Sequence, residues 1–516
     1  MSPIHQNRSI ISSFLGVLAC LLIIPPIAAH AALPPTLDVV QVDWVCVTDA
    51  ALVEDYGPLA AHREDQGLTT LVVSLADVIL WSPAGDDTTA SLRWLAGVAH
   101  WQWGARYLLL GGSHATLPAP LHRISIMDQD YDYPTDAYYA CLEGDWDTDG
   151  DGLVAEWDED AADPTIHLRV GRVPADDGQT IADVVAKIIA FENRTTAAAG
   201  GGLFVSSLMD LNWDPSDPYP NWALLNTEAL RDTALAYDPS LRIGTLFQGP
   251  DPEHPESDPL NEAALVDSLG ARAHDFVYCQ LRGIDQAWEL VFPLTVSAST
   301  FDPLAGTGHS FLLTMVSGPV GDTRGEGVLR HLLTLPHGGA VAAMAPTGLS
   351  YIVPLHEIQK RLWPRLTDRN SERLGDAFVI ALTGFREDIG LTNKFFATTY
   401  WYQTLFGDPA TYIRPIEEQP SPAPPVAQLF NVRAVPNPFN PGTEIMFEVE
   451  EGNGGEKPVQ VEIFDLQGRH VATLLERPLP PGPHRVTWHA EGSSGLYFAR
   501  VTVDQKIKTI KLTLVK

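Results

Sequence analysis

Short apolar runs that end in glycine or a polar turn constrain the fold of this chain more than any other feature. They read WVCVTDA, TTLVVSL, RYLLLGG, FVYCQLRG, FLLTMVSG and GAVAAMAPTG, at residues 44–50, 69–75, 106–112, 276–283, 311–318 and 339–348. Runs of this length with little polar alternation are typical of strands that are buried on both faces of a parallel sheet.

Helical patterns lie between these runs. In TIADVVAKIIAFENR, residues 180–194, the apolar residues fall on one helical face: Ile181, Val184, Val185, Ile188 and Ile189. A second candidate helix, TASLRWLAGVAHWQWG, directly precedes RYLLLGG. Alternating strands and helices predict an α/β domain, and ligand sites of such domains lie at the carboxyl ends of the strands.

The C-terminal part has a different pattern. The stretch TYIRPIEEQPSPAPPVAQ contains five prolines, which predicts an extended linker at residues 414–426. Residues 427–516 then alternate apolar and polar side chains in short segments such as TEIMFEVEE and GLYFARVTVD, separated by glycine or proline turns. This pattern predicts a small all-β sandwich.

The N-terminus has the features of a secretory signal peptide, residues 1–31. Arg8 precedes the apolar run IISSFLGVLACLLIIPPIAA, and Ala29-His30-Ala31 forms a cleavage site of small residues. An alternative interpretation makes Cys20 a lipidation site. We therefore expect a secreted or cell-surface protein.

Charge and cysteine content exclude several classes. The chain of 516 residues has a formal net charge of −32, which argues against nucleic acid and anionic lipid as partners. Beyond the signal peptide only Cys46, Cys141 and Cys279 remain, and their number and spacing fit neither a disulfide framework nor a zinc ribbon.

An acidic segment, GDWDTDGDGLVAEWDED at residues 144–160, carries aspartate at alternate positions. Asp147, Asp149 and Asp151 match positions one, three and five of a calcium-binding loop, Leu153 offers a backbone carbonyl, and Asp158 falls at position twelve. Clustered carboxylates repel one another unless a cation neutralises them. The segment predicts a structural calcium site, with a solvated acidic turn as the alternative.

Several of these stretches together resemble the gingipain family of secreted cysteine peptidases. They are RYLLLGGSHATLP, TDAYYACLEGDWDTDGDGLVAEWDED, HLRVGRVPADDGQTIADVVAKIIAFEN, LPHGGAVAAMAPTGLSY and YQTLFGDPATYI. The resemblance covers residues 36–413 and implies a caspase-like α/β fold. In the last part of the chain, VPNPFNPGTEIMFEV, VEIFDLQGRHVATL and SGLYFARVTV resemble FlgD-like or type IX sorting-type immunoglobulin modules, which implies contact with the cell surface or secretion machinery.

The resemblance implies a histidine in an H-G pair after one apolar strand and a cysteine in an A-C pair after the next. Here the two strands end in Arg282-Gly283 and Val316-Ser317. Three substitutes can be considered: Ser317 as nucleophile, Cys279 as nucleophile, and His309 or His274 as base.

We therefore expect a peptidase fold without its catalytic pair, in a protein that binds a peptide or protein ligand. Arg282, which stays protonated, could hold a carboxylate by paired hydrogen bonds. The alternative is an active cysteine-type endopeptidase with a displaced pair of catalytic residues.

Overall fold

The computed structural model describes residues 41–514, with gaps at 127, 195–199, 208–221, 249–257, 272–273, 285–286, 292–293, 369–371, 416–431, 438, 450–455, 466–469, 491–494 and 505. The predicted signal peptide and nearly all of the predicted linker lie outside these residues. Among the described helices, none has both the length and the hydropathy of a membrane-spanning segment.

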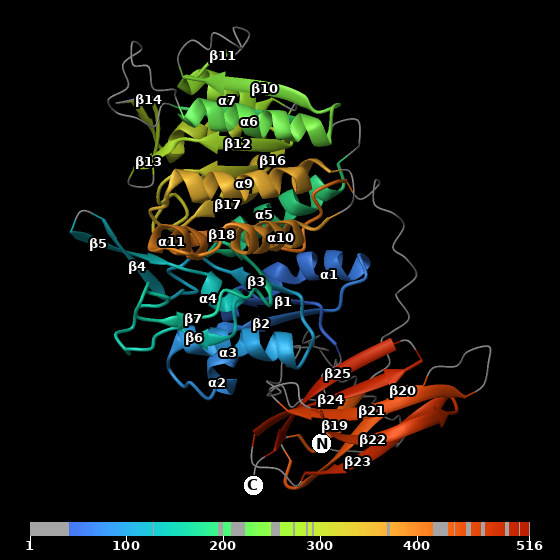
Figure 1. Ribbon diagram of the computed structural model, residues 1–516. Coiled ribbons are helices and arrows are strands. Elements are labelled where there is room, and N and C mark those ends of the chain that lie inside the picture. The colour runs from blue at the N-terminus through green and yellow to red at the C-terminus, as the bar shows by residue number, and fades with distance from the viewer. Residues whose placement is uncertain are drawn as a thin grey trace, which may run out of the picture.

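A mostly parallel sheet of eleven strands forms the centre of the first part of the chain (Figure 1). Across the sheet the strands are β11 (Asp258–Pro259), β10 (Arg242–Phe247), β9 (Gly201–Ser206), β12 (Phe276–Gln280), β16 (Ser310–Val316), β17 (Gly339–Pro346), β18 (Gln403–Phe406), β8 (Arg169–Val173), β3 (Tyr107–Gly111), β1 (Trp44–Thr48) and β2 (Thr70–Ser74). Strand β18 is antiparallel to β17 but parallel to β8, so strands β18, β8, β3, β1 and β2 run opposite to the other six strands.

Helices cover both faces of this sheet. They are α1 (Gly57–Asp65), α2 (Leu75–Trp81), α3 (Thr88–Trp101), α4 (Ala137–Ala140), α5 (Gly178–Glu192), α6 (Trp222–Tyr237), α7 (Glu262–Gly270), α8 (Val328–Thr334), α9 (Ile352–Thr367), α10 (Leu374–Asp388) and α11 (Lys394–Tyr402). Short 3₁₀ turns lie at Ala50–Leu52, Glu54–Tyr56 and Ala298–Leu304.

Both faces of the strands are apolar because both are covered. Successive side chains of a strand point to opposite faces. In β1, Trp44 and Cys46 pack with residues of α1 and α5, whereas Val45 and Val47 pack with residues of α3. The apolar runs of the sequence therefore predict these doubly covered strands correctly.

The two helices expected from the sequence are α3 and α5, and each begins at an aspartate. The carboxylate of Asp87 accepts a hydrogen bond from Ala90 N, and that of Asp177 accepts one from Thr180 N. On α5, the buried ammonium of Lys187 donates to the backbone carbonyls of Leu333 and Leu335 at the end of α8. This contact satisfies carbonyl groups that have no partner within α8.

Three small antiparallel elements extend from the central domain. A hairpin pairs β4 (Leu121–Ile126) with β5 (Gln129–Pro134), β6 (Gly144–Asp145) pairs with β7 (Ala161–Ala162), and β13 (Arg282–Ile284), β14 (Ala287–Val291) and β15 (Leu294–Val296) form a three-stranded sheet. The last of these begins directly after β12 and therefore lies at the carboxyl edge of the central sheet.

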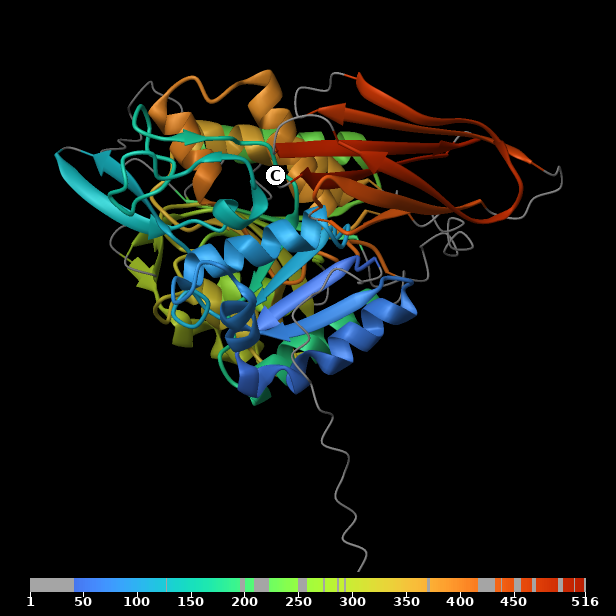
Figure 2. The same ribbon diagram turned by 90° about the horizontal axis from the view of Figure 1, so that it is seen from below.

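The C-terminal part consists of two antiparallel sheets, whose strands are coloured orange to red in Figure 2. One contains β19 (Val432–Val435), β20 (Gly442–Val449) and β23 (Gly482–His489), and the other contains β22 (His470–Leu479), β21 (Lys457–Asp465), β24 (Gly495–Val503) and β25 (Lys506–Leu514). Both sheets contribute to one apolar core, which includes Phe447 and Trp488 from the first and Ile463 and Val501 from the second. The predicted fold class, a caspase-like α/β sheet followed by a small all-β part, is confirmed.

Candidate functional site

The carboxyl ends of β12 and β16 bring the two predicted catalytic positions together. The strands are parallel neighbours, with Gln280 opposite Val316. Just beyond them, a Cβ atom added to Gly283 would lie 3.0 Å from Ser317 Oγ and 2.7 Å from a methyl group of Val320. The segment that carries Arg282-Gly283 therefore packs directly against the segment that begins at Ser317.

Arg282 forms an ion pair with Glu289 of its own hairpin. It lies opposite Glu289 in the antiparallel pair β13–β14, and its Nη1 atom is 3.5 Å from Glu289 Oε2. Glu289 is only 5% exposed, so its carboxylate needs a cationic partner, whereas Arg282 is partly exposed. The guanidinium that could bind a ligand carboxylate thus already faces a carboxylate of its own chain.

Ser317 is not presented as an activated nucleophile. Ser317 is only 2% exposed, and its Oγ atom has no hydrogen-bond partner within the part of the chain that the structure describes. A serine hydroxyl needs an adjacent base to attack a carbonyl.

Cys279 lies within β12 and is fully buried. Burial raises the pKa of its thiol well above the usual range. The thiolate is the reactive form of cysteine, so this thiol is inert at neutral pH. Cys46 and Cys141 are likewise buried and free.

The two histidines considered as bases lie at the opposite edge of the sheet. His274 precedes β12 and His309 precedes β16, and His309 Nε2 contacts the backbone oxygen of His274 at 2.9 Å. Strands rise about 3.3 Å per residue, so His309 lies roughly 25 Å from Ser317 along β16. Neither imidazole can take a proton from the Ser317 hydroxyl.

A buried polar network beyond the carboxyl ends of β3 and β16 was not anticipated from the sequence. His114 follows β3 and Thr323 follows β16, and Thr323 Oγ1 is 2.9 Å from His114 Nδ1 while His114 N donates to Thr323 Oγ1 at 3.1 Å. His114 Nε2 is 3.6 Å from Asp136 Oδ1. Although serine peptidases use a similar hydroxyl, imidazole and carboxylate, Thr323 is only 1% exposed, so its hydroxyl has no access to a substrate.

Arg172 completes this network. Its guanidinium donates to both carboxylate oxygens of Asp136 at 2.7 and 2.8 Å, and to the backbone oxygens of Gly112 and Leu117. Burial alone would raise the pKa of Asp136, but the Arg172 charge outweighs burial and lowers it well below its usual range. The network holds the loop after β3 in place. Sequence reasoning missed the network because His114 and Thr323 are 209 residues apart.

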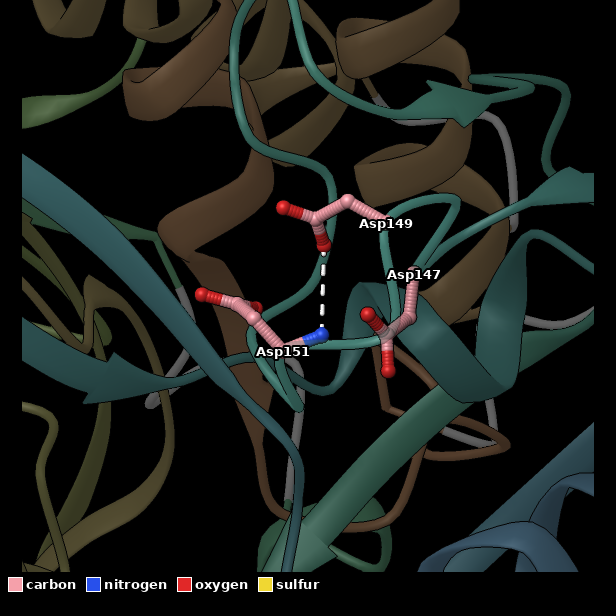
Figure 3. Close-up of side chains that lie close together, drawn as sticks. All are labelled: Asp147, Asp149 and Asp151. Carbon is pink, nitrogen blue, oxygen red and sulfur yellow. Dashed lines mark hydrogen bonds between the residues drawn. The ribbon is translucent and has the colours of Figure 1, made fainter.

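The acidic loop brings three of the predicted calcium ligands together (Figure 3). Carboxylate oxygens of Asp147, Asp149 and Asp151 lie within 4.8 Å of one another. Asp149 Oδ1 accepts a hydrogen bond from Asp151 N at 3.2 Å, and Asp151 Oδ1 accepts one from Leu153 N at 2.8 Å. The turn thus directs these side chains to one side of the loop. Leu153 is buried and forms a bridge to Leu121.

A second carboxylate group shares Asp149 and includes Glu156 and Glu159. Burial and the neighbouring carboxylates, Asp151 and Glu159 among them, raise the pKa of Glu156 to about 7. Asp158, the expected twelfth ligand, belongs to neither group among the described residues, so its role stays a prediction. Oxygen ligands at this spacing fit a hard divalent cation such as calcium.

Comparisons with known proteins agree with the fold. The model of peptidase family C25 matches residues 39–414. The crystal structure of gingipain R, an Arg-specific cysteine proteinase, shares 14% identity with a TM-score of 0.56, and the match covers 92% of this chain and 98% of that one.

A complex of the pro- and mature domains of RgpB from Porphyromonas gingivalis also shares 14% identity, with a TM-score of 0.55, over 92% of this chain and 100% of that one. A third structure, described as a protease, shares 13% identity with a TM-score of 0.52, over 91% of this chain and 97% of that one. No curated protein matches the chain. On the family match over residues 39–414, the chain belongs to peptidase family C25.

Proposed function

We propose that this protein is a secreted, non-catalytic member of its family, which binds a peptide or protein ligand without cleaving it. One observation carries the proposal. At the strand ends where the family resemblance implies histidine and cysteine, the chain has Arg282, which pairs with Glu289, and Ser317, which is buried and has no hydrogen-bond partner among the described residues.

The loss of turnover expected from removing a nucleophile or a base supports a non-catalytic protein over one with residual catalysis. Loss of a nucleophile or base alone costs hydrolases on the order of a million-fold in turnover. The three substitutes do not offset that loss. Cys279 is buried, Ser317 has no base within hydrogen-bonding distance in the part of the chain that the structure describes, and His309 lies at the opposite ends of the strands. An active endopeptidase with a displaced pair remains as an outcome of the test.

The test is to pass a broad peptide library over the immobilised mature chain, with and without calcium and reductant. We expect a subset of peptides to be retained and recovered intact, as judged by mass spectrometry. Retention of no peptide would contradict ligand binding, whereas recovery of cleaved peptides would contradict the loss of catalysis.

We further propose that the signal peptide and the C-terminal β-sandwich direct the protein to the cell surface or the medium. The resemblance of residues 427–516 to sorting-type modules supports this role. Deleting these residues should lower the surface and medium levels and leave the protein inside the envelope. Unchanged levels, measured by immunoblotting of each fraction, would show that the module is only an accessory.

We also propose a structural calcium ion in the acidic loop. The converging carboxylates of Asp147, Asp149 and Asp151 support it. When bound, calcium would neutralise these like charges and fix the turn.

A further inference from the structure

A small cavity lies inside the α/β domain, between strand β18, strand β8, helix α4 and helix α10. Its volume is about 30 Å³. Most of its lining is apolar, including Leu168, Phe378 and Leu382. Its polar lining includes Asp136 and Gln403, which are both only 4% exposed.

Gln403 makes this cavity unusual. Both amide atoms of the side chain, Oε1 and Nε2, have no hydrogen-bond partner among the residues that the structure describes. A primary amide has two donor hydrogens and an acceptor oxygen, and burying it without partners is strongly unfavourable. An apolar side chain of similar size would avoid this penalty. The buried amide therefore indicates that the cavity holds a ligand that forms hydrogen bonds with it.

We infer that the cavity binds ordered water, held by Gln403. A buried water needs roughly 10–15 Å³ and two to four polar partners, so the cavity has room for about two molecules. Gln403 supplies a donor and an acceptor. Both oxygens of Asp136 accept from Arg172 at 2.7 and 2.8 Å, and each retains a lone pair for a further donor.

The inferred water would extend the polar network of His114, Thr323 and Asp136 into the cavity that α10 lines. It would connect Gln403 on β18 with Asp136, which is paired with Arg172. Arg172 in turn donates hydrogen bonds to the loop after β3. The ligand is water and not an apolar guest, because a dry cavity is stable only where its walls offer no unpaired polar groups.

Crystals of the full chain, with and without xenon pressure, test the inference. We expect density for water within hydrogen-bonding distance of Gln403 Oε1 and Nε2, and no xenon in the cavity. Xenon in the wild-type cavity, or an amide of Gln403 that bonds only to protein atoms, would overturn it.

The variant Gln403→Met isolates the role of the amide. We expect it to lose the water density and to admit xenon, because the amide donor and acceptor are removed and Asp136, the acceptor that remains, is already paired with Arg172. The matched control is Gln102→Met at the exposed end of α3, which should change neither. Water retained unchanged in Gln403→Met would refute the role of Gln403. Should that variant fail to fold, the wild-type crystals alone decide.

Discussion

Single residues hold together loops that are far apart in the sequence. Thr323 and His114 exchange hydrogen bonds in both directions, since the threonine hydroxyl accepts from His114 N and Thr323 N donates to His114 Nδ1. Both residues are buried, so water cannot replace these bonds. The pair fixes the segment that begins at Ser317 against the loop after β3.

Replacing this threonine by its isostere tests that role. Thr323→Val keeps the volume but leaves a buried amide of His114 without an acceptor, so we expect a loss of about 1–3 kcal/mol in the free energy of unfolding. Urea denaturation measures it. Thr295→Val, at an exposed position of β15, serves as control and should change stability by less than about 0.5 kcal/mol. Equal stability of both variants would contradict the account.

A second buried cluster makes the protein sensitive to acid. Glu192, at the end of α5, accepts hydrogen bonds from the Arg63 guanidinium at 2.8 and 2.9 Å and from Tyr412 N at 2.6 Å, and contacts His62 Nε2 at 2.6 Å. Burial alone would raise the pKa of Glu192, but the Arg63 charge and these hydrogen bonds lower it from 4.5 to about 2.

The sign of the pH dependence follows from this lowered pKa. In the unfolded chain the carboxyl takes up a proton as pH falls below 4.5, whereas in the folded protein it does so only near 2. The stabilisation is therefore complete above pH 4.5 and is lost as pH falls to 2. We expect Glu192→Gln to be less stable than wild type by roughly 3 kcal/mol at pH 7, with a difference that shrinks over that window.

Thermal unfolding at several pH values measures this difference. The control is Asp65→Asn, at an exposed position of α1, which should show little difference at any pH. A difference between Glu192→Gln and wild type that stays constant down to pH 2 would contradict the assignment.

At the scale of elements, the acidic loop between β6 and β7 offers a direct test of the calcium proposal. Asp149 belongs to both carboxylate groups, so Asp149→Asn should weaken calcium binding most. A ligand at a hundred times its Kd stabilises a protein by about 2.7 kcal/mol. We expect a measurable rise in melting temperature with calcium for wild type and a much smaller rise for Asp149→Asn.

The exposed Asp145 belongs to neither group, so Asp145→Asn should respond to calcium as wild type does. Calorimetry measures the binding directly. Absence of binding heat in the millimolar range, together with no change in melting temperature on chelation, would refute the site.

Elements with a strong local pattern were predicted from the sequence, and those that depend on distant contacts were not. Strands β1, β3 and β16 are mostly apolar because helices cover both of their faces, and the apolar stripe of α5 follows its buried face. Strand β18 has only four residues, and its place between β17 and β8 depends on pairing with residues far away in the sequence. No local pattern reveals such a pairing.

In the candidate site, too, the features with a local sequence pattern were predicted and those that depend on contacts made by folding were not. Its two strand-end positions, Arg282 and Ser317, were identified from the family resemblance, which locates them after two of the apolar runs. The partner of Arg282 was not identified, because Glu289 becomes its neighbour only through the turn of the β13–β14 hairpin. The amide of Gln403, which has no partner among the described residues, likewise becomes apparent only once the surrounding helices and strands enclose it.

At the scale of the whole molecule, the chain combines a family C25 domain with a C-terminal β-sandwich in one polypeptide. The central domain keeps the parallel sheet and the adjacent strand ends that its fold uses to position a site. The side chains at those ends form an internal ion pair and a buried hydroxyl instead. The account therefore predicts that the fold persists while the chemistry is absent.

Peptide turnover by the purified mature chain tests this central claim most directly. The measurement compares kcat/KM of wild type with that of the double variant Arg282→His plus Ser317→Cys on the same fluorogenic peptides, with calcium and reductant present. The account predicts no turnover by wild type. Turnover by the double variant, which regains a thiol and an imidazole at adjacent strand ends, would show that the missing pair, and not the burial of position 317, keeps the wild type silent. Wild-type cleavage that Ser317→Ala or Cys279→Ala abolishes would contradict the account.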